Sequence, residues 1–212
     1  MVDLIEQLIT SKYLKTSRLI KAFKKIKRED FVLPGEKQES ELNVPLNIGF
    51  GQTISQPLTV AFMLELLRPQ KGDNALDVGS GSAWVSALLA EIAGKDGRVY
   101  AIERIEELKN FGEQNAEKYK FVSEGRLKFF AGDGAKGLPK YAPFDVIHVG
   151  ASAAAIPTAL LEQLAIGGRL IIPEGVDIQE LVLIERQSQK EYTQRRFSGF
   201  VFVPLISETI KR

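Results

Sequence analysis

The start of the chain holds two short stretches in which apolar residues recur at helical spacing. Leu4 and Leu8 lie four residues apart, and Leu19 and Phe23 repeat that interval after a candidate N-cap at Thr16 or Ser17. This spacing predicts two short amphipathic helices at the beginning of the molecule.

The helical pattern breaks between residues 34 and 57, where Pro, Gly, Asn and Ser separate single apolar residues. Ile48, Phe50 and Ile54 need packing partners, so we expect a long ordered loop rather than a flexible linker. Loops of this length inside compact domains often carry function. Pro57 then suits the first turn of the helix that the next apolar stripe predicts.

From residue 74 onward, short apolar runs alternate with segments of helical spacing. This alternation is typical of an α/β fold in which helices cover both faces of a parallel sheet. Residues 180–185 and 192–203 follow with no convincing helix between them and predict an antiparallel pair that closes the sheet. The other predicted strands are residues 74–78, 98–102, 127–131, 144–149 and 169–172, and the predicted helices between them are residues 82–93, 105–119 and 157–164.

Composition narrows the choice of partner. Lys and Arg number 28 against 27 Asp and Glu, so the net charge of +1 does not favour nucleic acid or an anionic membrane. The chain has no Cys, which excludes disulfides, thiolate nucleophiles and Cys-ligated metal sites. Its apolar runs are well short of the ~20 residues of a membrane span. We expect a cytoplasmic protein whose partners include neither nucleic acid nor membrane.

The first strand of the alternating region ends near Asp77 and runs into a Gly-Ser-Gly turn. Gly79 and Gly81 let the chain turn sharply and approach a ligand without a Cβ in the way. A dinucleotide fingerprint needs a third glycine where Trp84 stands, and an indole obstructs the close helix–strand packing that glycine permits. The turn therefore disfavours nicotinamide and flavin dinucleotides.

Acidic residues follow at the ends of the next two predicted strands. Glu103 can accept both hydroxyls of a ribose, and Asp133, between Gly132 and Gly134, can face the exocyclic amine of adenine. Each feature alone has a plainer explanation, as a tight turn, a solvated strand end or an ordinary turn former. Together, at three adjacent strand ends, they predict an adenosine pocket without pyrophosphate, which is what S-adenosylmethionine requires.

Over essentially its whole length the chain resembles the protein-L-isoaspartate (D-aspartate) O-methyltransferase family. The most specific match is Ile-Gly-Phe-Gly-Gln-Thr-Ile-Ser-Gln-Pro at residues 48–57, where class I methyltransferases in general have no such motif. Further matches are the segments at residues 28–32, 142–151, 163–164, 167–173 and 202–205.

The resemblance implies a Rossmann-like class I methyltransferase fold with a mostly parallel seven-stranded sheet, an antiparallel last strand, helices on both faces and extra N-terminal helices. It implies one domain over residues 1–212. Within it, residues 1–56 hold the N-terminal helices and the active-site loop, and residues 57–212 hold the cofactor-binding core and the C-terminal strands.

The same resemblance implies methyl transfer from S-adenosylmethionine, leaving S-adenosylhomocysteine, to the carboxylate of L-isoaspartyl residues in damaged proteins and peptides. D-aspartyl residues are a second candidate acceptor, the protein is expected to be a monomer, and no metal is involved. The methyl ester then cyclises to a succinimide that reopens partly to normal aspartate, which is a repair reaction. Ser55 matches the active-site serine. The implied cofactor residues are Thr53, Ile54, Ser55, Asp77, Gly79, Ser80, Gly81, Glu103, Arg104, Gly132, Asp133 and Gly134, and the implied substrate residues are Ile54, Ser55, Val203 and Pro204.

The chain departs from the family pattern at several positions. Ala83 stands where a third glycine is usual, and Trp84 stands where tyrosine is usual and is expected to narrow the donor pocket. Asn43 occupies the place of an aspartate ahead of the loop, in a segment that also lacks the family's tyrosine, so loop anchoring or substrate preference is expected to differ. Glu174 replaces a valine, with no effect predicted.

The reaction itself needs no general base. A free carboxyl group has a pKa near 4 and is already ionised at neutral pH. His148, the only histidine, lies in an apolar strand segment and is expected to be structural. The enzyme must align oxygen, methyl and sulfur and exclude water. Ser55 suits the task as a neutral donor that orients the carboxylate, with helix N-cap ahead of Pro57 as its alternative role.

Two alternative functions stay open. One is a class I methyltransferase with a small-molecule or RNA acceptor, for which the changed residues 41–43 are the only support. The other is a non-catalytic module that senses S-adenosylmethionine or its product, against which the intact Ser55 counts.

Overall fold

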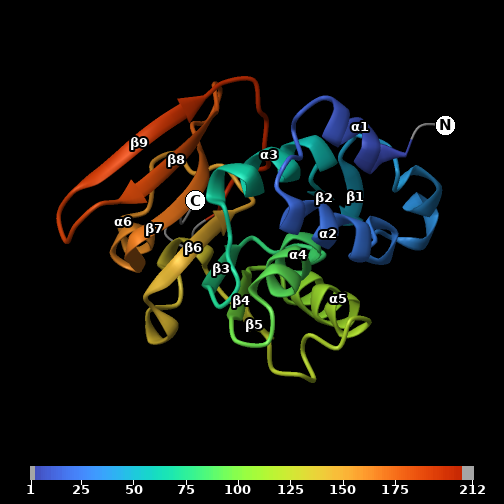
Figure 1. Ribbon diagram of the computed structural model, residues 1–212, viewed down its shortest axis with the longest axis horizontal. Coiled ribbons are helices and arrows are strands. Elements are labelled where there is room, and N and C mark those ends of the chain that lie inside the picture. The colour runs from blue at the N-terminus through green and yellow to red at the C-terminus, as the bar shows by residue number, and fades with distance from the viewer. Residues whose placement is uncertain (1–2, 207–212) are drawn as a thin grey trace.

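The computed structural model describes residues 3–206, and Figure 1 shows their arrangement. Within this range no helix has the length and apolar character needed to cross a membrane. The helices are α1 (Leu4–Thr10), α2 (Ser17–Lys25), α3 (Pro57–Leu67), α4 (Trp84–Ala93), α5 (Glu106–Glu117) and α6 (Thr158–Glu162), with 3₁₀ helices η1 (Arg28–Phe31), η2 (Pro34–Glu39), η3 (Gly134–Lys136) and η4 (Pro139–Tyr141). The strands are β1 (Leu46–Gly49), β2 (Gln52–Ile54), β3 (Asn74–Val78), β4 (Arg98–Glu103), β5 (Leu127–Ala131), β6 (Phe144–Val149), β7 (Leu164–Glu174), β8 (Glu180–Arg186) and β9 (Tyr192–Phe197).

A seven-stranded sheet in the order β5-β4-β3-β6-β7-β8-β9 forms the centre of the molecule. The pairs from β5 to β7 are parallel, whereas β7 with β8 and β8 with β9 pair antiparallel. The predicted mostly parallel sheet and its closing antiparallel pair are therefore confirmed. The chain crosses from the β5 edge to the other side of β3 when it enters β6, and this reversal creates a crevice at the carboxyl ends of β3 and β6.

Alternation along the strands gives the sheet two apolar faces. Ala75 and Val99 belong to a large core cluster that also contains residues of α3, α4, α5 and the N-terminal helices. Leu76 follows Ala75 directly, and Ile102 comes three residues after Val99. Both belong to a second cluster on the opposite face, which also contains Leu160 of α6. Because side chains alternate between faces with a period of two, short apolar runs supply both clusters.

The N-terminal helices pack beside α3 and α4 rather than on the sheet itself, as Figure 1 shows in blue next to teal and green. Glu65 of α3 accepts hydrogen bonds from the main-chain nitrogens of Lys15 (2.6 Å) and Thr16 (2.7 Å). Phe23 of α2 meets Trp84 of α4 edge to face, with ring centroids 5.6 Å apart. The start of the chain is thereby attached to the helices that flank the crevice.

The expected loop over residues 34–57 is wrong in part, because it contains η2 and the antiparallel hairpin β1–β2. Ile48 and Ile54 are buried as expected, but Phe50 is 58% exposed at the hairpin turn. Gly49, Phe50 and Gly51 all have positive φ, so the turn directs the Phe50 side chain outward. Sequence periodicity could not separate strands this short from a loop.

Four further predicted boundaries are wrong. The strand predicted at residues 169–172 is β7, which extends from Leu164 to Glu174. The helix predicted from residue 82 begins at Trp84, because Ala83 has a left-handed conformation with φ of 72°. The helix predicted for residues 157–164 covers only Thr158–Glu162, since Leu164 already belongs to β7. The last predicted strand stops at Phe197, and the segment that follows continues without regular pairing until the bridge between Ser152 and Pro204.

Candidate active site

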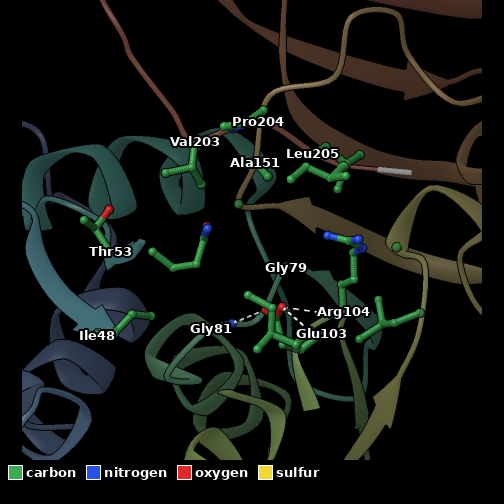
Figure 2. Close-up of a pocket in the computed structure, with 16 residues that line it drawn as sticks. Ile48, Thr53, Gly79, Gly81, Glu103, Arg104, Ala151, Val203, Pro204 and Leu205 are labelled. Carbon is green, nitrogen blue, oxygen red and sulfur yellow. Dashed lines mark hydrogen bonds between the residues drawn. The ribbon is translucent and has the colours of Figure 1, made fainter. Parts of the chain in front are cut away.

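Three cavities meet at the carboxyl ends of the parallel strands. The first lies between the glycine turn after β3, the end of β4, the β1–β2 hairpin and residues 203–206, and Figure 2 shows it. The second lies between the β2–α3 connection and residues 199–203, and the third lies beneath the glycine turn. Thr53 and Gly150 border all three cavities. Ligands in neighbouring cavities would therefore touch at this point.

The glycine turn supplies space rather than free donors. The main-chain nitrogens of Gly79 and Ser80 donate to the Ile102 carbonyl at 2.9 and 3.2 Å, and Gly81 N donates to Glu103 Oε2 at 2.9 Å. Gly79 and Gly81 have φ of 72° and 51°, which glycine adopts without strain. A pyrophosphate would need these N–H groups, so the turn suits an uncharged part of a ligand better than a phosphate.

Glu103 is the acidic residue at the floor of the first cavity. Its side chain is 8% exposed. One oxygen accepts from Gly81 N, and the other accepts from the main-chain nitrogens of Arg104 at 2.8 Å and Ile105 at 3.0 Å. The dashed lines of Figure 2 mark these bonds. The carboxylate is held rigidly, and its remaining lone pairs can accept from hydroxyl groups in the cavity.

Asp133 contributes to the architecture of the neighbouring strand end. Its Oδ1 accepts from Ala135 N at 2.9 Å, which caps η3, and its Oδ2 lies 3.8 Å from the Lys136 ammonium. Gly134 borders the first cavity, but Gly132 and Asp133 do not border it. A Cβ at Gly134 would stand 2.5 Å from Val78 Cγ1, so this position requires glycine.

Asp77 is buried below the glycine turn, where both of its oxygens have protein partners. His148 Nδ1 lies 2.7 Å from Asp77 Oδ1, and the Ser86 hydroxyl donates to Oδ2. Asp77 and His148 are 1% and 4% exposed, and both border the third cavity. Ser80 borders the same cavity, and its buried hydroxyl has no hydrogen-bond partner among residues 3–206. The third cavity therefore offers polar groups to a small polar end of a ligand.

Ser55 lies at the junction between the second and third cavities. It is not the N-cap of α3, because that position is Gln56, which makes no side-chain capping bond. Asn43 Oδ1 accepts from Leu58 N at 2.9 Å in the first turn of α3 and so caps the helix from a distance. The alternative role predicted for Ser55 is therefore wrong, and its hydroxyl is not needed for the helix end.

The segment after β9 forms a wall shared by the first two cavities. Ser152 N donates to the Val203 carbonyl at 2.8 Å, and Leu205 N donates to the Ser152 carbonyl at 2.7 Å. The Gln179 side chain accepts from Phe202 N at 2.7 Å and donates to its carbonyl at 3.1 Å. In Figure 2, Val203 and Leu205 lie along one side of the cavity, opposite Gly81 and Glu103. These bonds fix the wall without regular strand pairing.

Most of the sequence-predicted site residues come together around the three cavities. Gly132 and Asp133 are the exceptions, since neither borders any of the three cavities. Those at the first cavity are Thr53, Gly79, Gly81, Glu103, Arg104, Gly134, Val203 and Pro204; the second adds Ser55; and the third adds Ile54, Asp77 and Ser80.

The departures from the family pattern have definite places. Trp84 does not border the first cavity but borders the third, and its ring meets Phe23 of α2 edge to face. Glu174 pairs with Arg196 of β9 at 2.7 Å and accepts from Ile156 N at 3.3 Å, so it ties the end of β7 to its neighbours. Because Trp84 borders the third cavity, the expected narrowing of the donor pocket by this side chain stays a prediction.

Sequence reasoning missed residues that reach the site from several elements. Gly150 was the easiest of these to predict, because it directly follows the predicted strand at residues 144–149, which pairs with β3. A Cβ at Gly150 would stand 3.0 Å from the Gly79 carbonyl, so the junction depends on glycine. The other missed residues are Ile48, Gln52, Ile102, Ile105, Ala151, Leu205 and Ile206 at the first cavity, Pro45, Gln56, Leu58, Thr59 and residues 199–202 at the second, and Ser82, Trp84, Val85 and His148 at the third.

Comparison with known proteins agrees with this geometry. A family model described as protein-L-isoaspartate(D-aspartate) O-methyltransferase matches residues 1–210. A relative from Aeropyrum pernix named protein-L-isoaspartate O-methyltransferase is 45% identical over 206 residues, which is 97% of this chain and 78% of the relative. A relative of the same name from Methanopyrus kandleri is 43% identical over 206 residues, which is 97% of this chain and 90% of the relative.

Among solved structures, one similar chain comes from Plasmodium falciparum and is described as a protein-L-isoaspartate O-methyltransferase in complex with S-adenosyl-L-homocysteine. It superposes with a TM-score of 0.85 at 28% identity, over 96% of both chains. The likeness extends over the N-terminal helices, the sheet and the C-terminal wall alike.

Proposed function

The chain belongs to the protein-L-isoaspartate (D-aspartate) O-methyltransferase family, and from this premise we propose that it methylates the carboxylate of L-isoaspartyl residues in damaged proteins, with S-adenosylmethionine as donor. D-aspartyl residues are the second candidate acceptor. The observation that carries the proposal is the meeting of the first two cavities at Thr53 and Gly150, with Ser55 on the acceptor side. Transfer between two bound molecules requires such a shared boundary.

The residues of the first and third cavities fit S-adenosylmethionine. Glu103 would accept the ribose hydroxyls, and Ile102 and Leu205 would lie against the adenine ring. The unpartnered hydroxyl of Ser80 in the third cavity would bind the amino-acid end. When bound, this cofactor supplies an electrophilic methyl group on a positively charged sulfur, and its product is S-adenosylhomocysteine. Within residues 3–206 no cluster of His, Asp and Glu is suited to a metal ion.

The second cavity fits the acceptor side of a peptide. Its border combines the polar residues Thr53, Ser55 and Gln56 with the apolar residues Leu58 and Phe202. The Ser55 hydroxyl would donate to one carboxylate oxygen and direct the other oxygen toward the first cavity. A neutral donor suits this task, because a cation at this place would stabilise the free carboxylate more than the charge-dispersed transition state.

The chain needs no general base for the transfer. A carboxylate oxygen forms the new bond to the methyl carbon, the carbon–sulfur bond breaks, and its electron pair remains on sulfur, so no proton moves. His148 does not border the second cavity and pairs with Asp77, in keeping with a structural role. The wall at Phe202 and Val203 would exclude water from the reacting groups.

The proposal extends to the setting of the enzyme. We infer that the chain acts in the cytoplasm as a monomeric single domain, with isoaspartyl proteins as its partners. Sedimentation equilibrium tests the monomer, which requires a mass of 23.5 kDa. A mass that doubles at micromolar concentration would contradict this part of the proposal.

An acceptor panel tests the proposed function. The chain is incubated with S-adenosylmethionine carrying a labelled methyl group and with an isoaspartyl peptide, a structured RNA or a small carboxylic acid. The proposal requires label in the isoaspartyl peptide as a base-labile ester. Label in RNA or in the small acid alone would contradict it.

A further inference from the structure

Arg28 is a buried cation whose partners are all main-chain carbonyls. Its residue is 3% exposed. Nη1 donates to the carbonyls of Ser40 at 3.1 Å and Leu42 at 3.2 Å, while Nη2 donates to those of Val44 at 2.8 Å and Ser55 at 3.2 Å. The guanidinium thus joins the segment before β1 to the residue that carries the candidate active-site hydroxyl.

The other side of Arg28 faces the helix that follows the glycine turn. The guanidinium carbon lies 5.5 Å from the centroid of the Trp84 ring, and Trp84 is the first residue of α4. The Trp84 indole also donates to the Ile26 carbonyl at 3.4 Å. Arg28 therefore lies between the segment at residues 40–55 and helix α4, and it contacts both.

This burial is costly, which argues for a specific role. No carboxylate in residues 3–206 forms an ion pair with Arg28, and its buried Nε has no hydrogen-bond partner among them. Desolvation by burial lowers the pKa of Arg28 to about 10, against a weaker opposing effect of Glu41. An apolar side chain would fill the space at lower cost but would leave the loop carbonyls without donors. The planar fork of arginine satisfies four carbonyls that converge on one point.

We propose that Arg28 is a positioning residue for methyl transfer, which holds the main chain at Ser55 in a fixed place relative to the donor site. The inference rests on the proposed function, since it assigns Ser55 a place beside the reacting carboxylate. Arg28 acts through Ser55 and touches neither substrate nor cofactor, because it borders none of the three cavities.

The test compares Arg28→Lys with a matched control. Lysine keeps the charge but presents a single ammonium that cannot reach four carbonyls. Arg126 is the control, because its guanidinium lies 4.6 Å from the Phe121 ring centroid, donates to the Ala90 carbonyl and has a buried Nε without a partner in the described chain. Unlike Arg28, it also pairs with a carboxylate, that of Glu124 at 3.3 Å. It lies away from the three cavities, so Arg126→Lys reports the structural cost alone.

We expect Arg28→Lys to lower kcat for an isoaspartyl peptide about 10- to 100-fold, as a displacement of ~1 Å at a reacting group does. Binding of S-adenosylhomocysteine, measured by calorimetry, should change less than about threefold, because the first cavity is intact. Arg126→Lys should leave kcat within about twofold. Equal losses of kcat in both variants, or a loss confined to cofactor binding, would overturn the proposal.

A double-mutant cycle with Ser55→Ala separates positioning from general loosening. If Arg28 acts through Ser55, Arg28→Lys should lower kcat much less in the Ser55→Ala background than in the wild type. Full additivity of the two effects would overturn the proposal.

Hydrogen exchange makes the inference independent of the acceptor. Arg28→Lys should speed exchange of main-chain amides over residues 43–56 and leave α5 unchanged, whereas unchanged exchange in this loop would overturn the positioning role. If the wild type fails to methylate the isoaspartyl peptide, the proposed function is contradicted. The exchange rates then test by themselves whether Arg28 fixes the main chain at residues 43–56.

Discussion

His148 Nδ1 lies 2.7 Å from Asp77 Oδ1 beneath the glycine turn, where both residues are almost completely buried. A carboxylate only accepts hydrogen bonds, so Nδ1 carries the proton in this pair. The contact joins the parallel neighbours β3 and β6 where their ends frame the crevice. It is therefore a structural bond at the border of the third cavity.

Removing the imidazole should destabilise the fold. His148→Ala leaves the Asp77 carboxylate buried with Ser86 as its remaining side-chain partner, and we expect a loss of about 2–4 kcal/mol in the free energy of unfolding. His148→Asn keeps an N–H donor near the position of Nδ1 and should recover part of the loss. Urea denaturation measures both variants. An Ala variant as stable as the wild type, or an Asn variant no better than Ala, would contradict this role.

The carboxylate of Glu103 should dominate affinity for the donor. The Glu103 carboxylate accepts hydrogen bonds from main-chain N–H groups. In Glu103→Gln an amide NH₂ faces one of these donors, and the side chain becomes a weaker acceptor for the ribose hydroxyls. We expect affinity for S-adenosylhomocysteine to fall about 10- to 100-fold in calorimetry. Glu107→Gln, on the exposed face of α5, is the control and should bind normally. Unchanged affinity in Glu103→Gln would rule out its place in the donor site.

Ala83 holds a backbone conformation that favours glycine, with φ of 72°. Ala83→Gly should therefore raise the free energy of unfolding by about 0.5–1 kcal/mol, because relief of the left-handed strain outweighs the added flexibility of the unfolded chain. The same change at Ala87, inside α4, should lower it by about 1 kcal/mol. Thermal and urea unfolding of the two variants give the signs. A lower free energy of unfolding in Ala83→Gly would contradict the claim that the backbone of Ala83 is strained.

The contribution of Asp73 to the free energy of unfolding should be less favourable at neutral pH than at acid pH. Burial raises its pKa above the ordinary value of 3.8, and the neighbouring charge of Asp145 adds to the effect. A raised folded-state pKa means that the charged form is disfavoured by folding. The stabilising contribution is thus present at low pH and lost as the pH rises through the folded-state pKa.

Asp73→Asn removes this charge and keeps an oxygen that accepts from Gln70 N. We expect its Tm at pH 7 to exceed that of the wild type by about 1–2 °C, the size of a screened charge effect of ~0.5 kcal/mol. The advantage should vanish as the pH falls toward 3.8. Asp96→Asn, at an exposed pair with Lys71, is the control. An advantage that grows on acidification would have the wrong sign.

Local patterns predicted the sheet well, because burial on both faces leaves a run of consecutive apolar residues in strands such as β4. The β1–β2 hairpin escaped prediction, since its strands are too short for a period and depend on positive φ at Gly49 and Gly51. The cap that Asn43 provides for Leu58 joins residues 15 positions apart, so no local pattern could indicate it.

The candidate site was predictable where a motif lies at a strand end. The glycine turn, Glu103 and Ser55 all reach the cavities, because parallel strands bring their carboxyl ends to one edge. Asp133 caps η3 and does not border the first cavity, so its contact with the adenine amine stays a prediction. The bonds of Arg28 to loop carbonyls depend on the folded path of the loop and were invisible in the sequence.

The most direct test of the central claim compares an isoaspartyl peptide with its normal aspartyl twin, using labelled methyl transfer by the wild type and by Ser55→Ala. The account predicts label in the isoaspartyl peptide only, and a fall in kcat/KM of about 10- to 100-fold in Ser55→Ala, the cost of one hydrogen bond to a charged group. Equal labelling of the twins would contradict the proposed acceptor. Full activity of Ser55→Ala would contradict the orienting role of its hydroxyl.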